Sequence, residues 1–103
     1  MNETDWMHEV MMYLSERGFK VFRTNVGKVR LADGRFFDTG LPKGFSDLFA
    51  VKDGRAYFLE TKVKPYKPTK EQLIFLSVMR RAGCKAGIAY TIEDVKEIIN
   101  DKI

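Results

Sequence analysis

The sequence has one cysteine, one histidine, three prolines and no long apolar run. The single cysteine, Cys84, excludes an intramolecular disulfide and leaves a thiolate metal cage without partners. The single histidine, His8, disfavours mechanisms that combine a histidine base with histidine ligands, so carboxylates must hold any catalytic metal. No segment approaches the roughly 20 apolar residues of a membrane span, and the acidic N-terminus does not resemble a signal peptide. These absences predict a cytoplasmic protein without membrane partners.

The 103 residues carry a net charge of +4, and the pI is about 9.3. The length predicts a single domain, residues 1–103, with one modest core. Lysine and arginine gain affinity for nucleic acids by displacing counterions from phosphates, so the basic balance favours a polyanionic partner. The charge alone leaves that partner open.

The N-terminal half alternates between regular and irregular segments. An apolar stripe predicts a helix over residues 5–17, capped by Thr4. Residues 20–26 are typical of a strand. Residues 27–43 form a long irregular excursion, part of which, around residues 35–37, can pair as a short strand. Long loops in compact domains are often functional.

The clearest local signal is a β-hairpin. Two strand-like runs, residues 47–52 and 55–62, flank Asp53 and Gly54, a dipeptide typical of a two-residue hairpin turn. Apolar residues occupy both faces of these strands, which indicates that helices cover the sheet on both sides. The hairpin therefore predicts a layered α/β fold.

The C-terminal half predicts two further helices with a strand between them. Thr69 and Gln72 have the spacing of a capping box, which opens a helix that ends at Gly83. Residues 86–90 are typical of a short buried strand, and Thr91 caps a final helix towards Asn100. The whole order predicts a mixed central β-sheet flanked by helices.

The hairpin register brings acidic side chains together. With the turn at Asp53 and Gly54, Asp47 falls opposite Glu60, with Cβ atoms about 4.5–5.5 Å apart. Two such carboxylates repel and lose solvation, which Mg²⁺ relieves by taking oxygen ligands. A shared proton or a salt bridge to lysine is the alternative.

Lys62 stands two residues after Glu60, so the alternation of a strand places both on one face. An ammonium group there can favour hydroxide formation and stabilise the charge on an attacked phosphate. A common surface ion pair at a strand end is the alternative.

Three segments together carry a family resemblance: Gly44-Phe45-Ser46-Asp47-Leu48, Leu59-Glu60-Thr61-Lys62, and Gln72 at the next helix start. The set resembles the PD-(D/E)XK nuclease superfamily, and within it the compact stand-alone VRR-NUC domains of phages and bacteria. Arg23-Thr24-Asn25-Val26-Gly27 is similar to the family's first-strand segment, whereas Ser46 departs from a frequent proline. The resemblance covers residues 9–99 and implies a restriction-endonuclease-like core of the αβββαβ type.

The resemblance implies a DNA endonuclease that depends on Mg²⁺ or Mn²⁺. The implied metal ligands are Glu9, Asp47, Glu60 and the Thr61 carbonyl. Lys62 would activate or position the water, and Gln72 would orient the site. Members of this kind are linked to branched DNA such as Holliday junctions and to homodimers, which implies work inside a bacterial or phage-infected cell.

Basic and aromatic residues outside the motif are candidate DNA contacts, because cations bind phosphates and rings stack on bases. They are Arg23, Lys28, Arg30, Lys43, Lys64, Tyr66, Lys67 and Lys70. A solvated, charged loop is the alternative for those that follow Lys62. Two other functions remain open, a nuclease fold that only grips DNA and a nuclease for duplex DNA or RNA without junction preference.

Overall fold

The structure is a computed structural model, and it describes residues 1–100. The last three residues of the predicted domain lie outside the described part. The elements in chain order are α1 (Glu3–Glu16), β1 (Lys20–Arg23), β2 (Lys28–Arg30), β3 (Phe36–Asp38), β4 (Leu48–Lys52), β5 (Arg55–Thr61), α2 (Lys70–Arg81), β6 (Lys85–Ala89) and α3 (Ile92–Ile99). Within residues 1–100, no helix combines the length and the apolar character needed to cross a membrane.

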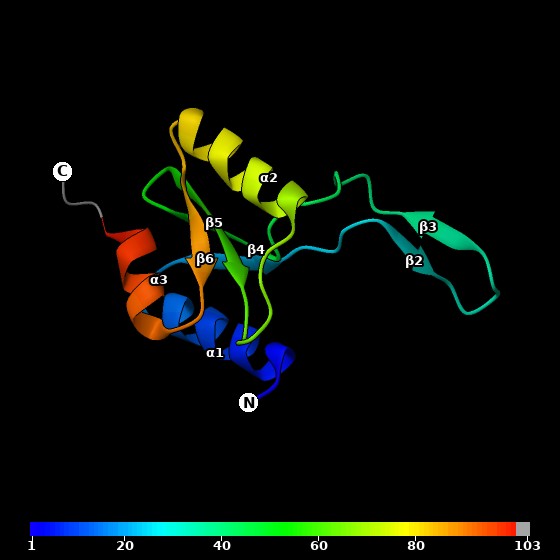
Figure 1. The fold of residues 1–103 in the computed structure, drawn as a ribbon, viewed down its shortest axis with the longest axis horizontal. Helices are drawn as coiled ribbons and strands as arrows, with labels where there is room; N and C mark the ends of the chain where they lie inside the picture. Colours follow the sequence, from blue (N-terminus) through cyan, green and yellow to red (C-terminus); the bar gives the residue numbers. More distant parts are fainter. Residues whose placement is uncertain (101–103) are drawn as a thin grey trace.

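The central sheet has the strand order β1-β4-β5-β6 (Figure 1). β1 and β4 pair antiparallel, as do β4 and β5, whereas β5 and β6 pair parallel. The parallel pair needs a crossover connection, which α2 supplies between β5 and β6. The predicted mixed sheet is confirmed.

The β4–β5 hairpin has the predicted register. Lys52 pairs with Arg55, and at the other end of the ladder Leu48 pairs with Leu59. Asp53 and Gly54 have φ angles of 53° and 75°, the left-handed values that a type I′ turn requires at both central positions. The register extended by one residue brings Asp47 to Glu60.

One face of the sheet is covered by α1 and α3 (Figure 1). The core on this side buries side chains from both helices and from the hairpin: Trp6, Val10, Leu14, Leu48, Leu59 and Val95. The Trp6 indole N–H donates to the Ala89 carbonyl oxygen at 2.9 Å, which satisfies its buried polar atom. The apolar stripe predicted for the first helix is thus the stripe that packs.

The opposite face is covered by α2 (Figure 1) through a cluster of aromatic rings. The Phe75 ring centroid lies 4.4 Å from that of Phe45 and 5.5 Å from that of Phe58. Phe58 in turn lies 5.2 Å from Phe49. The two-sided cover predicted from the hairpin is confirmed.

Several predicted boundaries were wrong. α1 begins at Glu3 because Asn2, not Thr4, is its N-cap and accepts a hydrogen bond from the Asp5 backbone N–H. β1 ends at Arg23 rather than at residue 26. On α2, Leu73 is 48% exposed, because the helix turns Phe75 and Leu76 towards the sheet.

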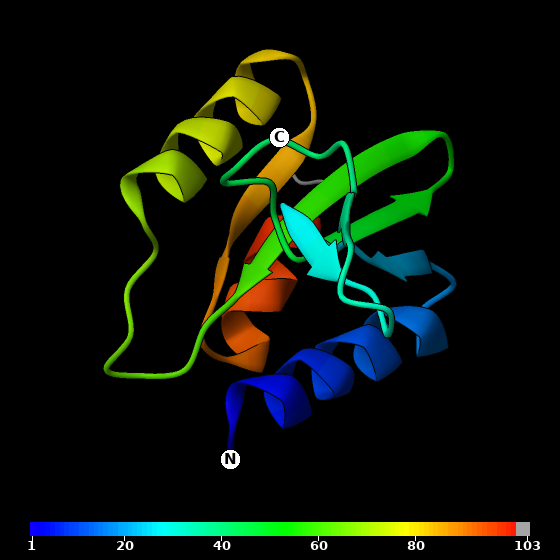
Figure 2. The same cartoon turned by 90° about the vertical axis from the view of Figure 1, so that its right-hand side faces the viewer.

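The irregular excursion contains a two-stranded ribbon. The short strand expected around residues 35–37 exists as β3, but its partner β2 was missed. All six strand residues are exposed, so β2 lacks the buried alternation by which a strand is predicted. Figure 2 shows the ribbon in front of the sheet, projecting towards the viewer.

Gly44 allows the chain to pass close to α2. Its φ is +92°, and a Cβ atom there would lie 2.5 Å from the Glu71 carbonyl oxygen. Gly34 has a similar φ of +91° with nothing within 4 Å. We expect Gly34→Ala to cost about 1–2 kcal/mol in unfolding free energy from φ strain, and Gly44→Ala to cost about 1–3 kcal/mol more from overpacking.

Chemical denaturation of both variants measures this difference. Equal losses in the two variants would contradict a close approach between Gly44 and α2.

Candidate active site

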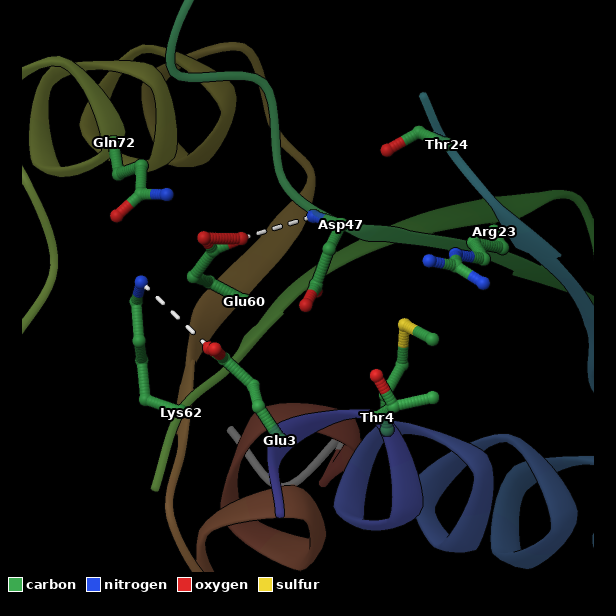
Figure 3. Close-up of a pocket in the computed structure, with 9 residues that line it drawn as sticks. Glu3, Thr4, Arg23, Thr24, Asp47, Glu60, Lys62 and Gln72 are labelled. Carbon is green, nitrogen blue, oxygen red and sulfur yellow. Dashed lines mark hydrogen bonds and ion pairs between the residues drawn. The ribbon is translucent and has the colours of Figure 1, made fainter. Parts of the chain in front are cut away.

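A polar pocket lies between the N-terminal turn of α1, the hairpin and the start of α2 (Figure 3). Its lining residues are Glu3, Thr4, Met7, Arg23, Thr24, Asp47, Glu60, Lys62 and Gln72. Five of these, Arg23, Asp47, Glu60, Lys62 and Gln72, are residues that the sequence predicted. The fold therefore brings all four predicted catalytic residues, Asp47, Glu60, Lys62 and Gln72, into one cavity.

Asp47 and Glu60 are held by hydrogen bonds that cross between the two strands. The Asp47 backbone N–H donates to Glu60 Oε1 at 2.9 Å. The Thr61 backbone N–H donates to Asp47 Oδ1 at 3.0 Å, and the Thr61 hydroxyl donates to Asp47 Oδ2 at 2.5 Å. Both carboxylates line the same pocket, and each is oriented by the strand opposite its own.

The buried surroundings of the site disfavour ionisation of both carboxyl groups. Burial raises the pKa of Glu60 to about 7, and the neighbouring charge of Asp47 adds to this rise. Burial also raises the pKa of Asp47, and the hydrogen bonds from Thr61 offset part of the increase. Both shifts favour the neutral forms, so a cation in the pocket would stabilise the charged forms.

Lys62 lines the same pocket as this pair. Its Nζ lies 3.8 Å from a Glu3 carboxylate oxygen, and its side chain is 14% exposed. The Lys62 backbone N–H donates to the Ala89 carbonyl oxygen at 3.1 Å, which continues the pairing with β6 beyond the end of β5. The backbone of this lysine is therefore held by the hydrogen bonding between β5 and β6.

Gln72 has two roles in the geometry. Its Oε1 accepts from the Thr69 backbone N–H at 2.8 Å and completes the predicted capping box. Its amide group also lines the pocket (Figure 3). A catalytic role for Gln72 stays a prediction.

A second hollow adjoins the pocket and contains one predicted DNA contact. Lys43 lines it. It shares Thr24, Asp47, Glu60 and Gln72 with the first pocket. The candidate site is therefore an extended depression and not an isolated hole.

Other predicted residues lie elsewhere. Glu9 is exposed and does not line the pocket, because Trp6, Met7 and Val10 take the buried face of α1. Lys28 and Arg30 lie on β2, outside the pocket. The exposed loop and the start of α2 carry Lys64, Tyr66, Lys67 and Lys70.

The acidic side chain that α1 contributes is Glu3, which the sequence did not predict. Glu3 and Met7 are four residues apart and therefore share one helix face. The predicted helix began at residue 5 and left Glu3 outside it, so the sequence did not indicate that Glu3 and Met7 share a face. The signal that could have found it is Asn2, a preferred N-cap residue three positions before Asp5.

The residues present fit a hard divalent cation. Among residues 1–100, no three histidine, cysteine or acidic side chains gather to form a metal cage. Mg²⁺ does not need one, since it is often bound by one or two carboxylates together with water and substrate phosphate. Asp47 and Glu60 provide that pair, in surroundings where hydrogen bonds offset only part of the cost of burying their charges.

No protein-family model matches the sequence, and no curated protein matches it. The comparison with solved structures does find its fold, which is a restriction-endonuclease-like nuclease fold. The fold class predicted from the sequence is confirmed.

Two particular structures share this fold. A VRR_NUC domain superposes with a TM-score of 0.68 at 19% identity, over 98% of this chain and 97% of the other. Hjc, a Holliday junction resolvase from Archaeoglobus fulgidus, superposes with a TM-score of 0.58 at 17% identity, over 85% of this chain and 67% of the resolvase. The VRR-NUC resemblance stated from the motifs is thus matched by the three-dimensional fold.

The raised pKa of Glu60 predicts how the metal-free protein responds to pH. A carboxyl group whose pKa rises on folding destabilises the fold as pH increases from its unfolded value, near 4.5, to its folded value of about 7. We expect the unfolding free energy to fall over this range, by about 3 kcal/mol from Glu60, since each unit of pKa shift corresponds to roughly 1.4 kcal/mol.

The measurement is urea denaturation between pH 4.5 and 8 in EDTA. Glu60→Gln should flatten the dependence and Glu16→Gln, at an exposed position of α1, should not. Parallel curves for the wild type and Glu60→Gln would contradict a raised pKa at Glu60.

Proposed function

We propose that the protein is a metal-dependent endonuclease that hydrolyses phosphodiester bonds in DNA, with Mg²⁺ or Mn²⁺ as its cofactor. The observation that carries this proposal is the pairing of Asp47 with Glu60 in one polar pocket, with Lys62 beside them. The fold shared with a VRR_NUC domain and a Holliday junction resolvase supports it.

Three groups of the hairpin would hold the cation: the carboxylates of Asp47 and Glu60, and the Thr61 carbonyl. The bound cation would stabilise the negative charge that builds on the attacked phosphate. The hydrogen bonds between the strands keep both carboxylates in place, so little reorganisation is needed when the substrate enters.

Lys62 and Gln72 would act on the attacking water. The Lys62 ammonium favours the deprotonated form of a nearby water and stabilises the charge on the phosphate. Gln72 lines the same pocket (Figure 3) and can orient that water or the phosphate. Arg23 and Lys43 line the depression and would contact the phosphates next to the cleaved bond.

Branched DNA, such as a four-way junction, is the substrate we propose. The fold shared with a Holliday junction resolvase supports this choice. In a four-way junction, two of the strands are related by twofold symmetry. Because one pocket cleaves one strand, the proposal includes a homodimer with the same symmetry.

The main rival is a nuclease fold that only grips DNA. The raised pKa values of Asp47 and Glu60 oppose it, since a binding module gains nothing from buried, mutually repelling carboxylates. Calorimetry with Mn²⁺ separates the two: the wild type should bind Mn²⁺ and Asp47→Asn should not. Absence of Mn²⁺ binding by the wild type would favour the rival.

Removal of the central groups should abolish cleavage. We expect Glu60→Gln and Lys62→Ala each to lower kcat by about 10²-fold or more, because each removes charge stabilisation or proton transfer at the reacting phosphate. The assay uses labelled single-stranded, duplex, flap and four-way-junction DNA with Mg²⁺ or Mn²⁺.

Two controls make this assay decisive. Lys96→Ala removes an exposed lysine of α3 and should cleave like the wild type. Cleavage that persists in EDTA and in both active-site variants would overturn the mechanism. Equal cleavage of duplex and junction would keep the nuclease and remove the junction preference.

A comparison of Glu3→Gln with Glu9→Gln tests which acidic residue of α1 serves the site. Glu3 pairs with Lys62 at a half-exposed position, and such pairs are worth roughly 0.2–1 kcal/mol. We therefore expect Glu3→Gln to lower kcat about two- to fivefold and Glu9→Gln to leave it unchanged. A larger loss in Glu9→Gln would favour the sequence prediction over the geometry.

A further inference from the structure

The two-stranded ribbon formed by residues 28–38 is an outgrowth of the rim of the active site. Its N-terminal strand follows Arg23 and Thr24, which line the pocket. At its base, the Thr24 backbone N–H donates to the Asp47 carbonyl oxygen at 2.9 Å, and the Thr24 hydroxyl donates to the Ser46 carbonyl oxygen. DNA that occupies the pocket can therefore continue directly onto the ribbon.

The ribbon exposes large apolar side chains. Phe36 is 63% exposed and Phe37 is 57% exposed, while Val29 and Leu31 are each about 40% exposed. A lone two-stranded ribbon is marginally stable in water, and gathered apolar exposure is typical of an interaction surface. Figure 1 shows the ribbon extending away from the sheet and helices.

The cross-strand register separates the side chains of the ribbon into two chemically different faces. Arg30 pairs with Phe36 and Lys28 with Asp38, so these four side chains share one face. The other face carries Val29 and Phe37, which pair with each other, as well as Leu31 and Arg35.

The face of Phe36 has cations available for a ligand. The guanidinium carbon of Arg30 lies 5.9 Å from the centroid of the Phe36 ring. Asp38 accepts from the Gly40 backbone N–H. No described carboxylate lies within salt-bridge distance of Arg30. On the opposite face, Arg35 is paired with Asp33 at 2.7 Å.

We propose that this face binds unpaired nucleotides of the DNA substrate, with Phe36 stacked on a base and Arg30 and Lys28 on the adjoining phosphates. Aromatic rings next to cations are the usual means of binding single strands, because every base has a π face and every nucleotide a phosphate. The inference rests on the proposed function and deepens it, since a flap is a branched DNA that carries unpaired bases beside a duplex. Phe37 and Val29 lie on the opposite face of the ribbon, outside this binding surface.

Binding measurements on uncleaved DNA test this proposal separately from catalysis. The protein carries Glu60→Gln, and the ligands are two fluorescein-labelled oligonucleotides, a blunt duplex and the same duplex with a single-stranded flap. Fluorescence anisotropy gives Kd for each. Phe36→Leu keeps an apolar side chain and removes the π face, and Phe37→Leu makes the same change on the opposite face.

We expect Phe36→Leu to weaken binding of the flapped DNA about tenfold, the loss expected for one stacked base, with the blunt duplex changed less than twofold. Phe36→Trp should restore flap binding, and Phe37→Leu should leave both affinities unchanged. Arg30→Gln should weaken binding of the flapped DNA more than binding of the blunt duplex, and should reduce the salt dependence of flap binding by about one phosphate contact. Lys96→Ala is the matched control for charge.

Three results would overturn the proposal. Phe36→Leu could leave flap binding unaffected, or it could weaken flap and duplex binding equally. Phe37→Leu could weaken flap binding more than Phe36→Leu does. A change from dimer to monomer in sedimentation, with DNA binding intact, would assign the ribbon to a second copy of the chain instead. If Phe36→Leu loses flap selectivity while the protein still cleaves DNA, the ribbon proposal is supported and the proposed function stands. Absence of cleavage on every DNA, with the selectivity present, removes the nuclease but leaves the ribbon a binding element.

Discussion

The structure depends on two carboxyl groups held close together at the end of a β-hairpin. Asp47 and Glu60 are buried enough that their pKa values rise, and burial of this kind is costly unless hydrogen bonds or a cation compensate it. The compensation in the described residues comes from backbone N–H groups and from Thr61, whose hydrogen bonds cross between the strands. The apolar layers on both faces of the hairpin make this arrangement rigid.

The surrounding elements pack so that their polar side chains reach the same end of the hairpin. The close passage of Gly44 against α2 brings the segment that carries Asp47, just before β4, next to the helix that carries Gln72. The Trp6 indole bonds to Ala89, which anchors α1 beside β6 and brings Glu3 towards Lys62. Sites built on packed strands and helices hold their geometry more tightly than sites on loops, which suits chemistry that depends on position. The ribbon, by contrast, lies outside the packed layers and suits contact with a larger ligand.

Much of the fold could be predicted because its signals are local. The Asp53-Gly54 turn fixed the register of β4 and β5, and this register alone brought Asp47 opposite Glu60. The Thr69 and Thr91 capping boxes placed the starts of α2 and α3. The start of α1 was misplaced because Asn2 and Thr4 are both acceptable caps, and a shift of two residues removed Glu3 from the helix. β2 escaped prediction because none of its side chains is buried.

The sequence by itself determined the hairpin, its register and hence the pair of carboxylates with Lys62 on the same strand, because period-two alternation and a two-residue turn leave one pairing. Only the tertiary structure decided which residues of α1 meet this pair, and that Glu3 rather than Glu9 lies there. The rotation and position of a helix on a sheet follow from the packing of many side chains across the core, here Trp6, Val10 and Leu14 against Leu48 and Leu59. No local sequence pattern predicts the combined effect of these packing contacts.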